Sequence, residues 1–415
     1  MVFDIMTTDI GKVNYSGNSY GKSSASRADL DKYKKDNKGK DLNREWTYQE
    51  VWDEVLYSGN VLPKKLTKEH KVVFVDADAV VFRTSAAVET RSVKTVVGGI
   101  EVEFPTRTLL KEYCIDMDVE YNDLELEDCH TNEHISACLS TLKKSVRNIY
   151  RELDATHVVF YLGGSGNFRL DLPLPTQYKA QRKDMRRPDY LKDCRDFLNK
   201  HYDTFIISGV EADDIVVGMT GYIINNTDAY CTAFQLDKDF RGSLVKNRYY
   251  HIMNKQIEEL TGGIGRLELS KKDVKGEGLH WLLYQLNQGD TADGFSPKQF
   301  FKKRFGSKSY FNHFKDYDNE KDLLLAWIEK WKELLPEVIE FETWQGDWVK
   351  HDWLSLAELY WQCPYMKVSP DDTNTFSDLL DKYHLGYLVG RGGYRNGMKS
   401  GDIYDKVGDS YMVLT

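Results

Sequence analysis

The chain has 415 residues and a net charge of −9, with 41% hydrophobic and 29% charged residues. This is the composition of an ordinary globular protein that can bury a sizeable core. With 30 glycines and 9 prolines, the chain is neither collagen-like nor wholly disordered. It has no apolar run near the roughly 18 residues that span a bilayer, and its start lacks a basic segment ahead of an apolar one. The sequence therefore predicts neither a membrane protein nor a secreted one.

The six cysteines are scattered along the chain and form no CxxC pair. In a chain of this length, such cysteines indicate reduced thiols rather than a disulfide framework. We therefore expect a cytoplasmic protein, in the host cell cytoplasm if a phage encodes it.

The first third of the chain begins with a polar segment and leads to one strong strand. Residues 1–40 are rich in Gly, Ser and Lys, which predicts a loose arm. Thr47 with Glu50 three residues later predicts a capped helix start. Residues 71–76 are an unbroken apolar run that ends in an Asp, which is typical of a strand buried on both faces of a parallel sheet.

Helix and strand patterns then alternate along the chain. Residues 92–104 predict a hairpin around Gly98-Gly99, and the acidic residues 118–133 predict a loop. The further predicted elements are a helix at 134–153, strands at 157–162 and 204–207, a helix at 211–224, a strand at 230–236, and helices at 279–286, 297–305, 321–335 and 353–361. Residues 386–415 read as irregular. The alternation predicts an α/β fold with a parallel sheet.

Acidic residues follow the ends of several of these elements. The sequence reads VDAD at 75–78, GVEADD at 209–214, LDKD at 236–239 and GDTADG at 289–294. In open parallel sheets, ligands bind beyond the carboxyl ends of the strands. We therefore expect these carboxylates to meet at one rim of the sheet.

Carboxylates gathered in one cleft repel each other unless cations neutralise them. Because oxygen ligands suit Mg²⁺ or Mn²⁺ better than zinc, the pattern predicts two Mg²⁺ ions, for which Mn²⁺ can substitute. Two such ions about 4 Å apart can clamp the attacking and leaving oxygens of a phosphodiester. Taken singly, each acid is equally typical of a turn or a helix start, and Asp213 and Asp214 could simply favour a helix N-terminus. The recurrence of four clusters favours the metal interpretation.

A basic stretch lies between the predicted strands at 157–162 and 204–207. Residues 178–192 contain six basic residues and two acids. At helical spacing, four of the basic residues share one face, namely Lys179, Arg182, Lys183 and Arg186. Such a face would hold nucleic-acid phosphates beside a metal site, and Tyr178 and Tyr190 would stack on unpaired bases. A solvated helix face is the alternative interpretation.

Several of these motifs, in this order, resemble the flap endonuclease superfamily, and most closely its T7-type phage 5′→3′ exonucleases. The matching segments are VDAD (75–78), NFR (167–169), YKAQRK (178–183), GVEADD (209–214), LDKDF (236–240) and GDTADG (289–294). They span about residues 70–310. EADD, DKDF and GDxxDG in this order are much more specific together than any one of them alone.

The resemblance implies a fold and a domain organisation. The fold class would be α/β, a PIN-like nuclease domain with a parallel central sheet, a helical arch and a helical DNA-binding region. The implied divisions are an N-terminal extension at 1–68, a nuclease domain at 69–277 with the arch at about 170–200, a helix–hairpin–helix-like duplex-binding region at 278–310, and a C-terminal extension at 311–415.

The resemblance also implies roles for individual residues. The metal ligands would be Asp76, Glu211, Asp213, Asp214, Asp237, Asp239, Asp290 and Asp293, with Asp76, Asp213 and Asp237 also counted as catalytic. Lys179 and Arg182 would be the arch cations at the scissile phosphate. Further DNA contacts would come from Tyr178, Lys183, Arg186, Arg187, Lys298, Lys302, Lys303 and Arg304.

Two departures from the family pattern bear on function. Gly164 stands where the family has an Asp after its second strand, and GFSPKQFFKKRFGS replaces the Gly-rich turn that grips duplex DNA. The leading hypothesis is a metal-dependent 5′→3′ exonuclease and flap endonuclease in phage DNA replication, acting on DNA with 5′ ends or flaps and with RNA–DNA hybrids within reach. The alternatives are a catalytically impaired homologue that binds branched DNA, and an RNA-specific PIN-type ribonuclease.

Overall fold

The computed structural model describes residues 41–183, 185–236, 238–253, 255–270, 273–373, 375–389, 403–407 and 410–414. Contacts divide these residues into two compact units. The smaller unit contains residues 80–149 and 187–202, and the larger unit contains residues 41–79, 150–186 and those from 203 onward. The predicted loose arm, residues 1–40, lies outside the described residues.

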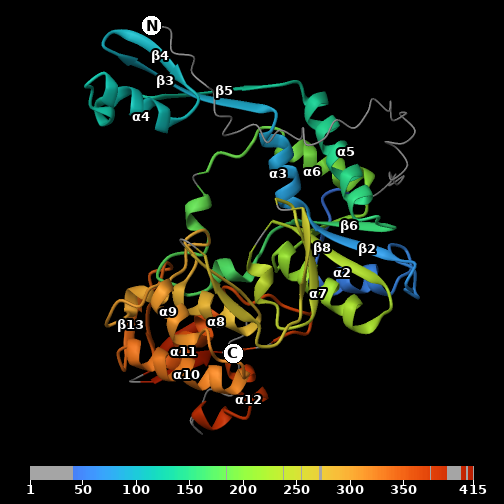
Figure 1. Ribbon diagram of the computed structural model, residues 1–415, viewed down its shortest axis with the longest axis vertical. Coiled ribbons are helices and arrows are strands. Elements are labelled where there is room, and N and C mark those ends of the chain that lie inside the picture. Colours follow the sequence, from blue (N-terminus) through green and yellow to red (C-terminus); the bar gives the residue numbers. More distant parts are fainter. Residues whose placement is uncertain are drawn as a thin grey trace. The chain divides into compact units, whose positions relative to one another are not determined.

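The larger unit is built on a seven-stranded sheet (Figure 1). Its strands, in spatial order, are β1 (Glu45–Trp46), β7 (Thr204–Ile207), β6 (His157–Gly163), β2 (Lys71–Asp76), β8 (Tyr230–Gln235), β9 (Asn247–His251) and β10 (Gln256–Leu260). All neighbours pair in parallel except β9 and β10. The prediction of an α/β fold with a parallel central sheet is confirmed. Because the strands are parallel, their carboxyl ends share one edge of the sheet. Three of the four acidic motifs (VDAD, GVEADD and LDKD) follow strands there, whereas GDTADG follows a helix.

One face of this sheet is covered by α2 (Tyr48–Leu56) and α7 (Ala212–Asn226). Val51 of α2 belongs to the same buried core as Phe74 of β2. The helix start predicted at Thr47 is confirmed, since Thr47 and Glu50 form a reciprocal capping box. On β2, all four residues from Val72 to Val75 are buried, as expected for a strand covered on both faces.

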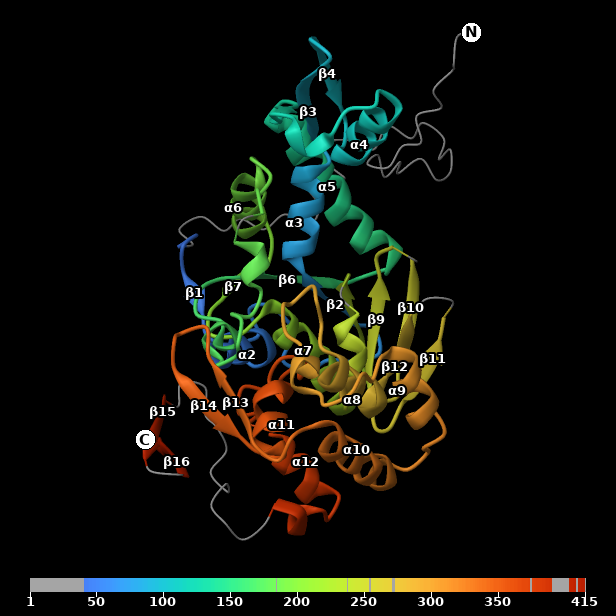
Figure 2. The same cartoon turned by 90° about the vertical axis from the view of Figure 1, so that its left-hand side faces the viewer.

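The C-terminal helices form a second core within the larger unit (Figure 2). They are α8 (Gly278–Gln288), α9 (Ser307–Phe314), α10 (Glu320–Leu334), α11 (Trp353–Trp361) and α12 (Phe376–Lys382). Trp327 and Trp331 of α10 are fully buried and stack on each other. The helix predicted at 297–305 is wrong beyond a single 3₁₀ turn (Pro297–Phe300). The backbone N–H of Lys302 instead donates to the carbonyl of Leu334. The chain after the turn therefore lies against the C-terminal end of α10 and does not continue as a helix.

The smaller unit contains a three-stranded antiparallel sheet in the order β4 (Ile100–Phe104), β3 (Glu89–Val97), β5 (Glu127–Asn132). Its helices are α4 (Arg107–Asp116) and α6 (Leu191–His201), and helices α3 (Ala77–Ala86) and α5 (Ile135–Glu152) run from one unit into the other. The hairpin predicted at Gly98-Gly99 is confirmed. The loop predicted at 118–133 is wrong over β5, which pairs with β3 although its sequence is polar, because its ladder bonds come from the backbone.

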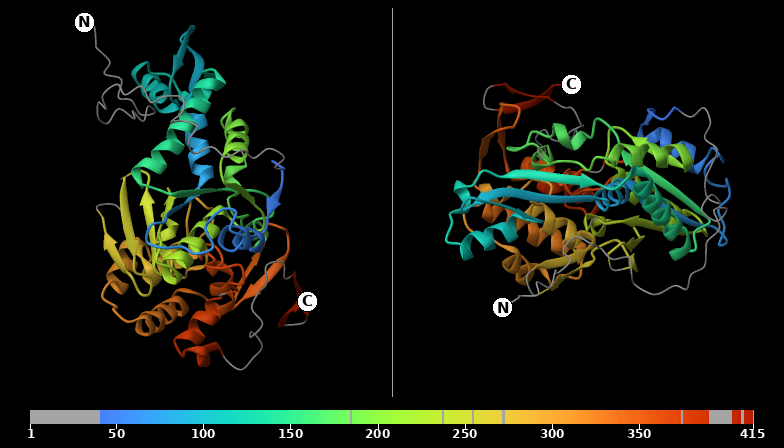
Figure 3. Two further views of the ribbon diagram at one scale, coloured as in Figure 1. Left: turned by 90° about the vertical axis from the view of Figure 1, so that its right-hand side faces the viewer. Right: turned by 90° about the horizontal axis from the view of Figure 1, so that it is seen from above.

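Three short hairpins complete the described elements (Figure 3). They are β11 (Arg266–Leu269) with β12 (Val274–Glu277), β13 (Ile339–Glu342) with β14 (Trp348–His351), and β15 (Ile403–Val407) with β16 (Ser410–Leu414). The last of these corrects the expectation that 386–415 is wholly irregular. The remaining 3₁₀ turns are Tyr121–Asp123, Phe168–Asp171, Ala180–Arg182, Asp239–Gly242 and Gly386–Val389. Among the described helices, none is both long and apolar enough to cross a membrane.

Candidate active site

The first candidate carboxylates lie at the ends of β2 and β8. The Oδ1 atom of Asp76 accepts a hydrogen bond from the backbone N–H of Asp78 (3.1 Å), and Oδ2 of Asp78 accepts one from the backbone N–H of Gly163 (2.7 Å). Asp239 is buried in the turn after β8 and accepts a hydrogen bond from the Gln285 side chain. Asp237 lies outside the described residues.

The second group lies at the start of α7, where Glu211 is the N-cap and Asp213 and Asp214 form the first turn. The fully buried Asp214 carboxylate accepts two hydrogen bonds from Arg169, at 2.7 and 2.9 Å, and one from the backbone N–H of Glu211 at 3.1 Å. Burial opposes ionisation of Asp214, but Arg169 and the backbone donors outweigh it and lower its pKa. Asp214 therefore stabilises the helix start, as the alternative interpretation predicts, and its role as a metal ligand stays a prediction.

The basic stretch is not the expected helix. Before α6 begins at Leu191, its described residues form only one 3₁₀ turn (Ala180–Arg182), and Lys179 has a left-handed φ of 57°. The stretch is instead tied to the loop after α8, because the backbone N–H of Lys179 donates to the carbonyl of Asp293 (2.8 Å). The Gln181 side chain donates to the carbonyl of Thr291 in the same loop (3.3 Å). The prediction that Lys179, Arg182, Lys183 and Arg186 share a helix face is therefore wrong.

Tyr178 faces the protein interior. Its ring is 2% exposed and stacks on Phe295. Its hydroxyl donates to Oδ2 of Asp293 at 2.7 Å, which occupies the polar end of the side chain. In this conformation Tyr178 orients a candidate metal ligand and has no free ring face for an unpaired base.

Two cations of the basic stretch neutralise the candidate ligands Glu211 and Asp293. Lys179 Nζ lies 2.5 Å from Glu211 Oε1 and 3.6 Å from Asp293 Oδ1. Arg182 Nη2 lies 2.8 Å from Asp293 Oδ1. Burial lowers the pKa of Lys179, but Glu211 and Asp293 outweigh this effect and raise it, so the ammonium stays charged.

A third cation, Lys238, neutralises Asp290. Its Nζ atom lies 2.7 Å from Asp290 Oδ2, and the backbone N–H of Ala292 donates to Oδ1 of the same carboxylate at 2.7 Å. Lys238 stands between the two acids of the DKD motif, so this motif supplies both a cation and candidate ligands. The motif therefore reaches the loop after α8 through Lys238.

The donors suit a hard divalent cation, because the candidate ligands are all carboxylates. Glu211, Asp290 and Asp293 each carry a lysine or arginine partner, and an ion would take over the charge that this partner now balances. Within the described part of the chain, no group of three or more His, Cys, Asp or Glu residues is arranged to hold a metal. A cation at these carboxylates would compete with Lys179, Arg182 and Lys238.

A glutamate side chain lies beside the strand end where the family has an aspartate. A Cβ atom built on Gly164 would lie 2.6 Å from the carbonyl oxygen of Ile207 and 2.9 Å from Cδ of Glu45. The Glu45 carboxylate accepts hydrogen bonds from the backbone N–H (3.2 Å) and the hydroxyl (2.5 Å) of Ser165. Because Gly164 has no side chain, the carboxylate of Glu45 in β1 can lie beside it.

The remaining predicted DNA contacts lie at the protein surface. Exposed side chains belong to Lys183, Arg186, Arg187, Lys298, Lys302, Lys303 and Arg304. Lys303 forms an ion pair with Glu333, and Arg187 belongs to the smaller unit. Their DNA-binding roles stay predictions. The sequence did not predict the contacts that Glu45, Arg169 and Lys238 make at this site. Arg169 lies in the NFR motif and Lys238 in the LDKDF motif, so two of the three were within recognised motifs.

Comparisons with known proteins give similarity only at the level of structure. No protein family model and no curated protein sequence matches the chain. The chain is similar to a bacteriophage T5 D15 flap endonuclease, solved as a pseudo-enzyme–product complex with DNA and metal ions, at 14% identity and a TM-score of 0.42; the match covers 77% of this chain and 98% of that one. A point mutant of the T5 5′-exonuclease is 15% identical with a TM-score of 0.39 and coverages of 77% and 98%. A T5 5′-exonuclease with bound zinc is 14% identical with a TM-score of 0.39 and coverages of 77% and 90%.

Proposed function

We propose that this chain is a metal-dependent 5′→3′ exonuclease and flap endonuclease that hydrolyses DNA phosphodiesters. The observation that carries the proposal is the pairing of the basic loop with the acidic motifs, in which Lys179 and Arg182 contact Glu211 and Asp293. Divalent ions bound to these carboxylates would release Lys179 and Arg182 from their ion pairs. The two cations could then bind a phosphate of the substrate instead.

In this proposal two Mg²⁺ ions, or Mn²⁺, are held by the carboxylates named from the sequence: Asp76, Glu211, Asp213, Asp214, Asp237, Asp239, Asp290 and Asp293. The bound ions would lower the pKa of a water molecule and polarise the phosphodiester. Lys179 and Arg182 would balance the charge that develops on the phosphate oxygens. Lys183, Arg186, Arg187, Lys298, Lys302, Lys303 and Arg304 would bind the phosphates of the flanking DNA.

Tyr178 has a positioning role in this proposal. Its buried hydroxyl donates a hydrogen bond to Asp293. Its ring stacks on Phe295 and so fixes the start of the basic stretch, which we also call the basic loop. The proposed substrates are DNA with 5′ ends or flaps, and RNA–DNA hybrids are within reach of the same site. The proposed setting is phage DNA replication in the host cytoplasm.

The test is cleavage of end-labelled 5′-flap and blunt duplexes, and of an RNA–DNA hybrid, with Mg²⁺ or with EDTA. The expected result is Mg²⁺-dependent cleavage that Asp290→Asn and Asp237→Asn each reduce by about 10²-fold or more. Asp318→Asn is the matched control, because Asp318 is exposed and belongs to no acidic motif of the site. Binding of branched DNA without any product would instead identify a catalytically impaired homologue.

A further inference from the structure

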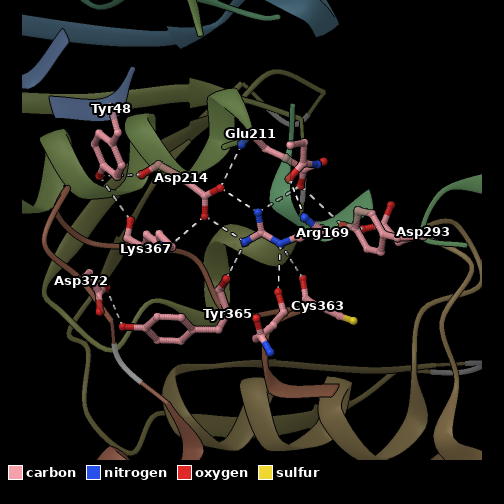
Figure 4. Close-up of polar contacts among 12 residues, drawn as sticks. Tyr48, Arg169, Glu211, Asp214, Asp293, Cys363, Tyr365, Lys367 and Asp372 are labelled. Carbon is pink, nitrogen blue, oxygen red and sulfur yellow. Dashed lines mark hydrogen bonds and ion pairs between the residues drawn. The ribbon is translucent and has the colours of Figure 1, made fainter. Parts of the chain in front are cut away.

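A single buried guanidinium joins two helix ends in the larger unit (Figure 4). Arg169, in the turn after β6, donates from Nη1 to Oδ2 of Asp214 (2.7 Å) and from Nη2 to Oδ1 (2.9 Å). Asp214 lies in the first turn of α7, where unpaired backbone N–H groups favour a negative charge. Arg169 thereby fixes the carboxylate that stabilises this helix start.

The other donors of Arg169 reach the chain that follows α11. Its Nε donates to the carbonyls of Gln362 (3.0 Å) and Cys363 (3.2 Å), and Nη2 also donates to the carbonyl of Tyr365 (2.6 Å). Gln362 is the C-cap of α11, and carbonyls at a helix C-terminus favour a cation. The planar guanidinium can serve both helix ends at once, whereas a lysine would supply only a point charge.

Residues 362–372, which we call the clamp segment, also contact α7 directly. The backbone N–H of Lys367 donates to Oδ1 of Asp214 at 3.0 Å. The segment lies close to the helix backbone, since a Cβ atom built on Gly218 would be 2.8 Å from the carbonyl oxygen of Val368. Asp372 holds the segment in shape by accepting hydrogen bonds from the Tyr365 hydroxyl (2.9 Å) and the backbone N–H of Val368 (2.8 Å).

The same contacts extend to a candidate metal ligand. The backbone N–H of Glu211 donates to Oδ2 of Asp214 (3.1 Å), and the Glu211 carboxylate lies 3.6 Å from Nη1 of Arg169. The clamp segment therefore contacts both residues that position Glu211. Asp214 accepts a hydrogen bond from the backbone N–H of Glu211, and Arg169 lies beside its carboxylate. The clamp segment reaches this site through its hydrogen bonds with Arg169 and Asp214.

We propose that the clamp segment is a positioning element of the nuclease site, which holds Glu211 in place for cation binding through Arg169 and Asp214. This inference rests on the proposed function and assigns a role to part of the C-terminal extension, for which the resemblance supplies none. Partners that orient metal ligands commonly change metal affinity by 10–100-fold when they are removed. The clamp segment is therefore expected to control metal affinity rather than DNA affinity.

The test compares Asp372→Asn with Asp371→Asn in the full chain. Both variants make the same change of charge, but Asp371 is exposed and adjacent. We expect Asp372→Asn to weaken Mn²⁺ binding about tenfold in calorimetry without DNA, to speed amide hydrogen exchange at residues 211–215 in metal-free protein, and to leave KM for a flap substrate unchanged. Tyr365→Phe, a milder change, should shift the same readouts in the same direction.

Two further outcomes separate this inference from the proposed function. Exchange rates and Mn²⁺ affinity that are equal in Asp372→Asn and Asp371→Asn would overturn the positioning role, even if the wild-type chain cleaves DNA. A wild-type chain that neither binds Mn²⁺ nor cleaves DNA would overturn the proposed function, and the exchange measurement would still show whether the clamp segment holds the start of α7. Arg169→Lys retains the positive charge but loses the planar guanidinium with its several N–H donors. This variant should weaken Mn²⁺ binding less than Arg169→Met, which also loses the charge.

Discussion

Lys179 and Glu211 form an ion pair in which Nζ lies 2.5 Å from Oε1 and both side chains are less than one-fifth exposed. Glu211 is the N-cap of α7, whereas Lys179 lies in the basic loop, and Asp293 is a second partner of the lysine at 3.6 Å. One ammonium therefore balances two candidate ligands. A divalent ion and this lysine would compete for the same carboxylates.

This competition gives opposite effects on binding and on catalysis. We expect Lys179→Met to bind Mn²⁺ more tightly than the wild type in the absence of DNA, because Glu211 and Asp293 lose their competing cation. We expect the same variant to cleave DNA about 10²-fold more slowly, because the charge on the phosphate is no longer balanced. Calorimetry and single-turnover cleavage measure the two effects. Lys321→Ala, an exposed change on α10, is the control, and weaker Mn²⁺ binding by Lys179→Met would contradict the prediction.

Gly218 of α7 is predicted to tolerate no side chain. A Cβ atom there would lie 2.0 Å from the Tyr48 hydroxyl and 2.8 Å from the Val368 carbonyl. Gly218→Ala should lower the free energy of unfolding by about 3 kcal/mol. Urea denaturation measures this change, and Gly306→Ala is the matched control because nothing lies within 4 Å of the added atom. Equal stability of the two variants would show that the clamp segment does not lie against α7.

Position 164 is predicted to tolerate no larger residue than glycine. The Ile207 carbonyl would lie 2.6 Å from an added Cβ, so Gly164→Ala should cost about 1–3 kcal/mol. Replacing Glu45 by Ala in the same chain should not restore stability, since the clash with the Ile207 backbone remains. Thermal unfolding of the single and double variants tests this, and full recovery in the double variant would assign the whole clash to Glu45.

His351 makes the C-terminal part of the larger unit sensitive to acid. Its buried ring stacks on Phe341, and burial lowers its pKa to about 4. In the unfolded chain the imidazole takes up a proton near pH 6.5, whereas the folded chain does not until about pH 4. The free energy of unfolding should therefore fall as pH decreases across this window, by at most about 3 kcal/mol. Urea unfolding at pH 7 and 4.5 should show a smaller loss in His351→Phe, and an equal loss would refute the assignment.

The sequence could predict the four strands β2, β6, β7 and β8 because each is a short, strongly apolar run, but it did not predict β9 and β10. The run that ends at Asp76 and the alternation of helix and strand require no knowledge of distant contacts. Strand β1 could not be found in this way, since it has two residues and exists through its pairing with β7. Polar β5 was missed for the same reason, because its stability comes from backbone bonds to β3.

The candidate site could likewise be predicted only in part, because local sequence patterns identify its acids but not the distant residues that contact them. The acids could be placed from their positions after strands and helices, because such positions follow from chain order. Their partners could not, since the contacts of Arg169 with the chain after α11 join residues nearly 200 positions apart. The helical interpretation of Lys179–Arg186 failed because hydrogen bonds to the loop after α8 outweigh local spacing.

The four ion pairs that Lys179, Arg182 and Lys238 form with candidate ligands also bear on the order of folding and the proposed metal binding. Acidic side chains that are already balanced by the protein's own cations do not need an ion to bring the chain together. In the proposed function, the chain would therefore fold before it binds metal, and metal binding would be a later step that depends on the concentration of free ions.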